Sequence, residues 1–147
     1  MVTIIDIADA VVTALNGPGV QSGFSQKFTA ARMYLPVFDL ADMKALRVTV
    51  VPKGTEMSMA GRGMAQSDVQ IDVAVQKKLG QPGGNAEIDA LMALVQEIAE
   101  FIRATGRFGS AAWVRTENLP IYSQEHLGQL NQFTSVLTLT FRLMEAT

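Results

Sequence analysis

The sequence predicts an α+β fold: a mostly antiparallel sheet of four to five strands with two helices packed on one face. Three observations support this prediction. Segments 3–15 and 85–105 repeat hydrophobic residues at helical spacing. Segments 68–78 and 132–143 alternate hydrophobic and polar residues, as half-buried strands do. The 147 residues fit a single domain, 1–147, which is long enough to bury one core without disulfides or a metal.

Two helices are expected, each with its own start and stop signals. Thr3 can cap the helix over 3–15, with Asp6 three residues later, and an Asn-Gly-Pro-Gly run ends it. Asn85 is expected to cap the second helix, and Gly106 to stop it. Both hydrophobic stripes need a sheet face to cover them. They comprise Ile4, Ile7, Val11 and Leu15 in the first helix, and Ile88, Leu91, Met92, Val95, Ile98 and Ile102 in the second.

Five strands are expected, at 24–34, 46–51, 68–78, 112–117 and 132–143. Turns are expected at 39–42 and 80–84, and residues 118–131 are irregular with one helical turn at 124–129. Trp113 is expected to pack in the core or against the sheet. The order α-β-β-loop-β-α-β-β favours both helices on one sheet face. The two longest strands have few lysines on their polar faces, so their edges invite pairing with another chain.

Residues 54–67, GTEMSMAGRGMAQS, are predicted to form a long flexible loop. Loops longer than about 12–15 residues without structure of their own are usually functional or disordered. This one holds three methionines, and methionine adapts well to the surface of a partner. Met57, Met59, Arg62 and Met64 are therefore candidate interface residues. We expect the segment to be an arm that becomes ordered on a neighbouring subunit.

Composition argues against several classes of partner. The formal net charge is −2, and Lys77-Lys78 is the only basic pair, whereas tight nucleic-acid binding needs a cluster of Lys and Arg. The absence of cysteine excludes disulfides and thiol catalysis. The N-terminal segment lacks the basic region of a signal peptide, and no apolar run reaches about 18 residues, so no membrane partner is expected.

No catalytic, cofactor-binding or metal site is predicted. Asp68 and Asp72 share one face of a strand but lie about 13 Å apart, which exceeds the ~5–9.5 Å between paired glycosidase carboxylates. His126 is the only histidine, and its neighbour Ser123 is too close in sequence for a catalytic triad, whose members come from distant segments. A lone histidine without cysteine also makes a poor zinc site.

Several phrases spread over nearly the whole chain resemble the tail terminator (tail completion) proteins of long-tailed bacteriophages. They are the N-terminal helix, ARMYLPVFDLADMKALRVTVVPKG, DVQIDVAVQKKLG, the amphipathic helix that follows, and PIYSQEHLGQLNQFTSVLTLTFRL. The resemblance implies a small α+β subunit that forms a homo-oligomeric ring, a hexamer. It also implies a place in the tail or neck of a virion that assembles in the host cytoplasm.

The resemblance further implies partners for such a ring. The ring would cap the tail tube protein, end tube elongation and present a surface to the head-tail connector or head-completion protein. DNA would pass through the ring without specific binding, and neither catalysis nor a cofactor would be involved. Asp68 and Asp72 are candidates for the ring lumen.

Three alternatives remain open from the sequence. The first is another neck component, namely a head-completion or connector protein. The second is a small cytosolic enzyme that uses Asp68, Asp72, Arg62 or His126. The third is a host cytosolic ligand-binding domain.

Overall fold

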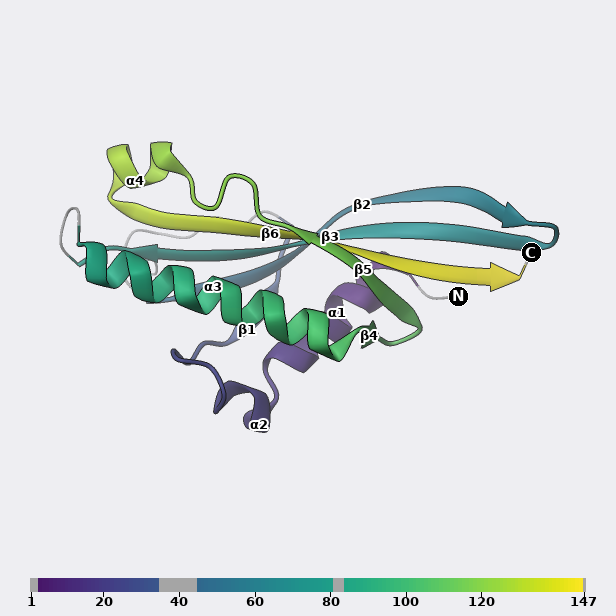
Figure 1. Ribbon diagram of the computed structural model, residues 1–147, viewed down its shortest axis with the longest axis horizontal. Coiled ribbons are helices and arrows are strands. Elements are labelled where there is room, and N and C mark those ends of the chain that lie inside the picture. The colour runs from purple at the N-terminus through teal and green to yellow at the C-terminus, as the bar shows by residue number, and fades with distance from the viewer. Residues whose placement is uncertain (1–2, 35–44, 81–83, 147) are drawn as a thin grey trace.

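Six strands form one sheet in the order β1-β2-β3-β6-β5-β4 (Figure 1). The computed structural model describes residues 3–34, 45–80 and 84–146. The elements are α1 (Ile4–Leu15), α2 (Pro18–Gln21), β1 (Ala30–Arg32), β2 (Arg47–Gly61), β3 (Met64–Lys78), α3 (Asn85–Thr105), β4 (Arg107–Phe108), β5 (Ala111–Glu117), α4 (Gln124–Leu130) and β6 (Gln132–Ala146). The turn expected at 39–42 lies outside the described residues, as does most of the turn expected at 80–84.

The sheet differs from the prediction in both strand count and strand direction. It has six strands rather than four to five, and it is mixed rather than mostly antiparallel, because β1 runs parallel to β2. The other neighbours pair antiparallel. The additional strand is β4, whose two residues are too few to show an alternating pattern. The strand expected at 24–34 shortens to β1, since only its last part lies beside β2.

Local sequence explains the ends of the two long helices. Thr3 and Asp6 form the expected capping box on α1: the Thr3 amide donates to Asp6 Oδ2 at 2.9 Å, and the Asp6 amide donates to Thr3 Oγ1 at 3.3 Å. Gly106 ends α3 in the left-handed conformation, with φ of 70°. The N-cap of α3 is Gly84 rather than Asn85, which is already the first helical residue.

One hydrophobic core lies between the sheet and the two long helices. Both α1 and α3 cover the same sheet face (Figure 1), which agrees with the predicted placement of two helices. Hydrophobic side chains of β3 and β6 alternate toward that face and are buried. The central members of the core are Ile7, Val11, Leu15, Val69, Ile71, Val73, Val75, Leu91, Val95, Ile98, Ile102, Phe133, Leu137, Leu139 and Phe141.

The sheet extends past the helices as a three-stranded arm. We define the arm as residues 55–61 of β2, 64–69 of β3 and 141–146 of β6; it points to the right in Figure 1, away from α3 and α4. Antiparallel ladders join its strands, from Thr55↔Val69 to Gly61↔Met64, with a register shift between Met59 and Gly61, and without interruption from Val69↔Phe141 to Met64↔Ala146. These strands replace the loop predicted at 54–67, so that prediction is wrong.

The misreading has a physical cause. Residues 55–61 of β2 are exposed on both faces, so this part of the strand needs no alternation of hydrophobic and polar residues, although Val69, Phe141 and Leu143 at the base of the arm are buried. Its glycines suggested a loop, although Gly61 and Gly63 flank a tight connection between β2 and β3, with Gly63 at φ 75°. The partner strand that completes the arm comes from residues 141–146, more than seventy positions along the chain.

Candidate functional site

The register of the arm gives it two different faces. Met57 lies opposite Ser67 and Met59 opposite Ala65, on the side continuous with the sheet face that carries the helices. We call this side the helix-side face. Met57 and Met59 are 76% and 86% exposed, so most of their apolar surface is in contact with water. This exposure marks the helix-side face as a candidate interface, because large exposed apolar groups that gather in one place often mark binding surfaces.

The four residues predicted as an interface do not share one face of the arm. Arg62 lies in the connection between β2 and β3, and Met64 opens β3 opposite Gly61 and Ala146. By the alternation along β3, Met64 belongs to the face opposite Met57 and Met59, which we call the outer face. All four residues nevertheless lie in the arm or in the connection at its tip.

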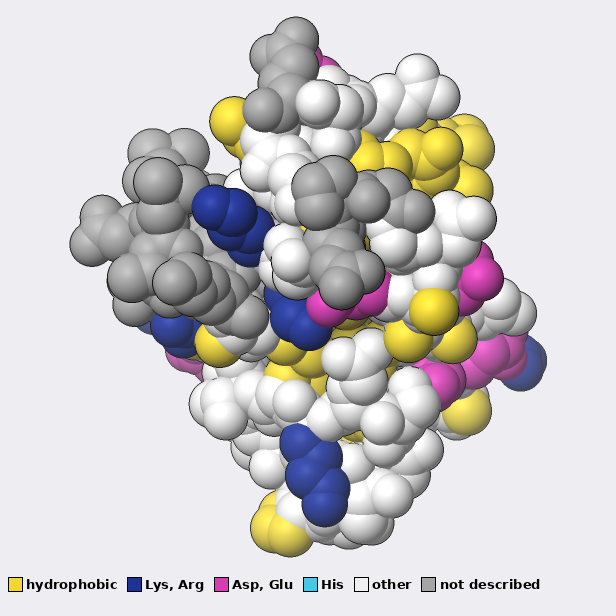
Figure 2. Space-filling model, turned by 90° about the vertical axis from the view of Figure 1, so that its left-hand side faces the viewer, with side chains coloured by type: hydrophobic (Ala, Val, Ile, Leu, Met, Phe, Trp, Pro, Cys, Tyr) yellow, Lys and Arg dark blue, Asp and Glu magenta, His cyan; other side chains and the backbone are white. Residues whose placement is uncertain are grey.

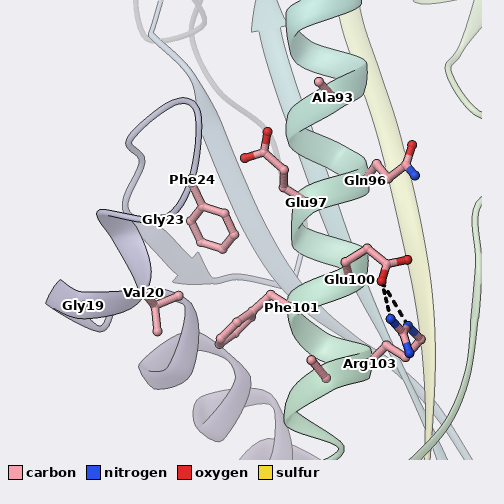
Figure 3. Close-up of a pocket in the computed structure, with 11 residues that line it drawn as sticks. Gly19, Val20, Gly23, Phe24, Ala93, Gln96, Glu97, Glu100, Phe101 and Arg103 are labelled. Carbon is pink, nitrogen blue, oxygen red and sulfur yellow. Dashed lines mark hydrogen bonds and ion pairs between the residues drawn. The ribbon is translucent and has the colours of Figure 1, made fainter.

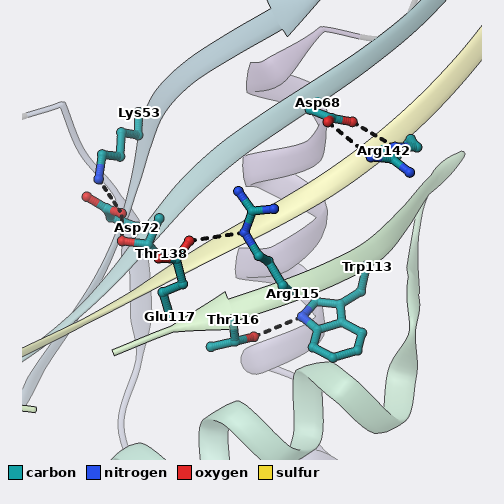
Figure 4. Close-up of polar contacts among 9 residues, drawn as sticks. All are labelled: Lys53, Asp68, Asp72, Trp113, Arg115, Thr116, Glu117, Thr138 and Arg142. Atoms are coloured by element: carbon teal, nitrogen blue, oxygen red, sulfur yellow. Dashed lines mark hydrogen bonds and ion pairs between the residues drawn. The ribbon is translucent and has the colours of Figure 1, made fainter. Parts of the chain in front are cut away.

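Asp68 forms a two-pronged ion pair on the outer face near the base of the arm. Arg142 Nε donates to Asp68 Oδ1 at 2.9 Å and its Nη2 donates to Oδ2 at 3.2 Å (Figure 4). These hydrogen bonds, followed by the charges of Arg142 and Arg115, hold the pKa of Asp68 below its ordinary value. The Asp68 carboxylate is therefore neutralised by a cation of the same subunit.

Asp72 is also partnered on this face. Thr138 Oγ1 donates to Asp72 Oδ1 at 2.8 Å, and Lys53 Nζ lies 3.9 Å from the same oxygen (Figure 4). The β2 register shifts between Pro52 and Gly54, so Lys53 sits at a bulge, a device that redirects a side chain. The sequence pattern does not reveal the pairing of Asp68 and Asp72 with cations. One of these cations could have been predicted from the sequence: the alternation of 132–143 places Arg142, the partner of Asp68, on the polar face of its strand.

Among the described residues, the side-chain contact of His126 is with a threonine rather than with a nucleophile or an acid. Its Nδ1 lies 2.8 Å from Thr134 Oγ1, and its backbone amide donates to Ser123 Oγ at 3.3 Å as the cap of α4. Ser123 thus interacts with the histidine backbone rather than with the imidazole. Trp113 packs against the core as expected, and its Nε1 donates to Thr116 Oγ1 at 2.8 Å (Figure 4).

A hollow of about 740 Å³ lies on the outer face, between the sheet and the segment that leads into α4. Its lining includes Lys53, Asp72 and Ser123, which already have the partners described above. Within the described ranges, no group of three or more His, Cys, Asp or Glu side chains is arranged to hold a metal ion. No helix in those ranges has the length and hydropathy needed to cross a bilayer.

At the end of the molecule opposite the arm, the charged side chains of the described residues are of both signs. Figure 2 shows this end, where Lys and Arg side chains lie apart from one another with Asp and Glu between them. Hydrophobic side chains gather at the height of α4. Leu119, Ile121 and Leu130, in and before α4, are among the exposed large hydrophobic residues of the chain.

Comparison with known proteins gives a likeness of fold. No protein-family model and no curated protein sequence matches the chain. Among solved structures, a chain from the virion of a native gene transfer agent (GTA) particle superimposes with a TM-score of 0.57. The two sequences are 12% identical, and the superposition covers 94% of each chain. The two proteins therefore share a fold over nearly their whole lengths.

Proposed function

We propose that this chain is a structural virion protein of the tail terminator type. Its ring would cap the tail tube, end tube elongation and join the tail to the head-tail connector or head-completion protein. The observation that carries the proposal is the shared fold with a chain of the GTA virion, which covers 94% of both chains. The resemblance of the sheet and turn phrases to tail terminators refines this virion role to the end of the tail.

The open edges of the sheet are suited to ring formation. Strand β1 pairs with Val48, Thr49 and Val50 only, so no described strand pairs with the outer edge of β2 from 51 to 61. An exposed strand edge can pair with a strand from another subunit. A head-to-tail contact of this kind forms a ring when the rotation from one subunit to the next adds up to a full turn. We propose that the ring is a hexamer. It would lie in the tail or neck of a virion that assembles in the host cytoplasm.

The outer face supports passage of DNA without specific binding. The ion pairs of Asp68 with Arg142 and of Asp72 with Lys53 neutralise both carboxylates, so this face is polar but carries little net charge. If it lines the ring lumen, phosphates would meet no cluster of cations to hold them. Replacing both aspartates with lysine should slow DNA release from assembled particles. Unchanged release in that variant would remove Asp68 and Asp72 from the lumen.

The main test is the oligomeric state together with tube capping. Light scattering and electron micrographs of the same peak should show rings, and density should appear at tube ends after purified tail tubes are added. A monomer that leaves tubes uncapped would contradict the proposal. Binding to the portal side of the neck instead would assign the chain to a connector or head-completion role.

The enzymatic alternative has a separate test. The structural role proposed here involves no catalysis and no cofactor. Alanine at Asp72 or His126 should therefore leave ring formation and tube capping unchanged. Loss of a measured turnover in either variant, with the fold intact by circular dichroism, would favour the enzyme.

A further inference from the structure

A groove runs between α3 and the segment that follows α1. Figure 3 shows its two walls: Val20 and Phe24 on one side, and the stretch of α3 that includes Ala93 and Phe101 on the other. The groove encloses about 760 Å³ and is open along one side. The Phe24 and Phe101 rings meet edge to face, with centroids 5.9 Å apart. The groove is thus a preformed, mainly apolar site of the size that binding pockets have.

The groove also carries a negative charge that no described cation neutralises. Glu97 Oε1 accepts the backbone amide of Ser25 at 2.7 Å, which is a hydrogen bond to a neutral group. The neighbouring Glu100 is different, because it pairs with Arg103 on the same helix (Figure 3). An occupant of this groove should therefore combine apolar side chains with a positive charge.

The arm has this combination. Met57 and Met59 point from its helix-side face, and Arg62 lies at its tip without an ion pair to any described residue. Glu145 is the one acidic residue on that face, at the β6 edge across from Ala65. The arm cannot reach the groove of its own subunit, because its strands pair with one another along the arm and it points away from α3 (Figure 1).

We infer that the helix-side face of the arm docks in the groove between α2 and α3 of a second copy of this chain. Met57 and Met59 enter the groove beside Phe24 and Phe101, where methionine sulfur makes favourable contacts with aromatic rings. Arg62 then lies near the Glu97 carboxylate of the second copy. The contact is heterologous, since arm and groove are different surfaces, so it can repeat around a ring.

The dimensions of the arm fit this contact. From residue 55 to 61 a strand spans about 20 Å, which is longer than the ~10–12 Å diameter of a helix. The arm can therefore cross α3 completely. One face of three strands covers at most roughly 200 Å², because Val69, Phe141 and Leu143 at its base are already buried, against ~800 Å² per partner in a stable interface. The arm thus supplies one part of a larger interface. The remaining area would come from the other subunit contacts of the proposed ring, and in this respect the inference rests on the proposed function.

Engineered cysteines give a direct test, because the chain has none of its own. One protein would carry Met59→Cys and a second Ala93→Cys, and the mixture would be treated with a short bismaleimide. Ser58→Cys is the matched control, since Ser58 precedes Met59 on the same strand but faces the opposite side. We expect roughly tenfold more cross-linked pairs from Met59→Cys than from Ser58→Cys, because alternate strand residues face opposite ways.

The charge contact has its own variants. Arg62→Glu should reduce the cross-link between Met59→Cys and Ala93→Cys, and Glu97→Lys in the groove protein should restore it. Arg62→Lys keeps the positive charge and should leave the cross-link yield nearly unchanged. Comparison of Arg62→Lys with Arg62→Glu therefore tests the charge contact even if Glu97→Lys impairs folding of the groove protein. A yield that does not respond to Arg62→Glu would remove Arg62 and Glu97 from the contact and overturn that part of the inference.

The outcomes separate this inference from the proposed function. Equal yields from Met59→Cys and Ser58→Cys, or no association at all, would overturn the docking. So would protection of Met59→Cys from thiol reagents that appears only when tail tubes are added, because the tube would then be the partner of the arm. Rings that cap tubes without the cross-link would leave the virion role standing. A specific cross-link in a protein that never caps tubes would support the docking of arm and groove and contradict the tail-capping function.

Discussion

Replacing Met57 and Met59 with glutamine should weaken self-association while leaving the folded subunit intact. Glutamine has nearly the length of methionine but adds an amide that resists burial in an apolar groove. In the isolated subunit both side chains are largely exposed, at 76% and 86%, so the double variant should change the free energy of unfolding by no more than about 0.5 kcal/mol.

The effect on association follows from the same exposures. Complete burial of an exposed methionine contributes about 1.5–3 kcal/mol, so these two residues would supply about 2–5 kcal/mol per contact. Side chains at an interface keep some exposure and lose rotamer freedom, so the lower end of this range applies. A loss of about 2 kcal/mol corresponds to roughly thirtyfold weaker association.

Sedimentation velocity over a range of concentrations would measure this change. Met144→Gln is the matched control, because Met144 is 48% exposed and lies on the outer face of the same arm. Thermal melting of dilute samples would confirm that all variants fold. Association of the double variant within a factor of two or three of wild type would refute the reasoning, as would an equal loss in Met144→Gln.

The remaining predictions concern the fold and its pH response. Val95→Asp should abolish cooperative melting by circular dichroism, because a charge at a 3% exposed core position costs several kcal/mol, whereas Asp at exposed Ala93 should be tolerated. Gly63→Val should speed amide exchange in the arm alone, since φ of 75° costs a β-branched residue about 1–2 kcal/mol. The pKa of Asp68 is lowered by Arg142, so this pair stabilises the fold above the ordinary pKa of an aspartate, and the contribution is lost as pH falls through the lowered value. Urea melts should therefore show Asp68→Asn less stable than wild type near pH 7, with the difference shrinking below about pH 4; a difference that grows there would contradict the assignment.

Elements that bury one face in the core are the ones best predicted from the sequence, because burial requires a regular spacing of hydrophobic residues. Helix α3 and strand β3 each bury one continuous stripe, so their periods are visible without any knowledge of their neighbours. The capping box at Thr3 and the left-handed Gly106 depend on local chemistry and were also readable. These features arise within a few residues of one another.

The misread elements depend on contacts between distant segments. Strand β4 exists because two residues pair with β5, and β1 is defined by three residues that lie beside β2. The arm requires residues 141–146 to pair with 64–69, which no local pattern predicts. For the same reason, sequence spacing placed Asp68 and Asp72 on one face but did not show which cations they meet.

The two faces of the arm give different reasons to expect a partner. On the outer face, Asp68 and Asp72 already form ion pairs with cations of the same subunit. A partner that binds there would gain little binding free energy, because its polar contacts would replace hydrogen bonds to water. On the helix-side face, the described residues leave Met57 and Met59 76% and 86% exposed, so contact with another molecule would remove apolar surface from water. Self-association of the chain should therefore be driven by the helix-side face, and the outer face should stay in contact with solvent. In the ring proposed above, this division would leave the outer face available to line the lumen.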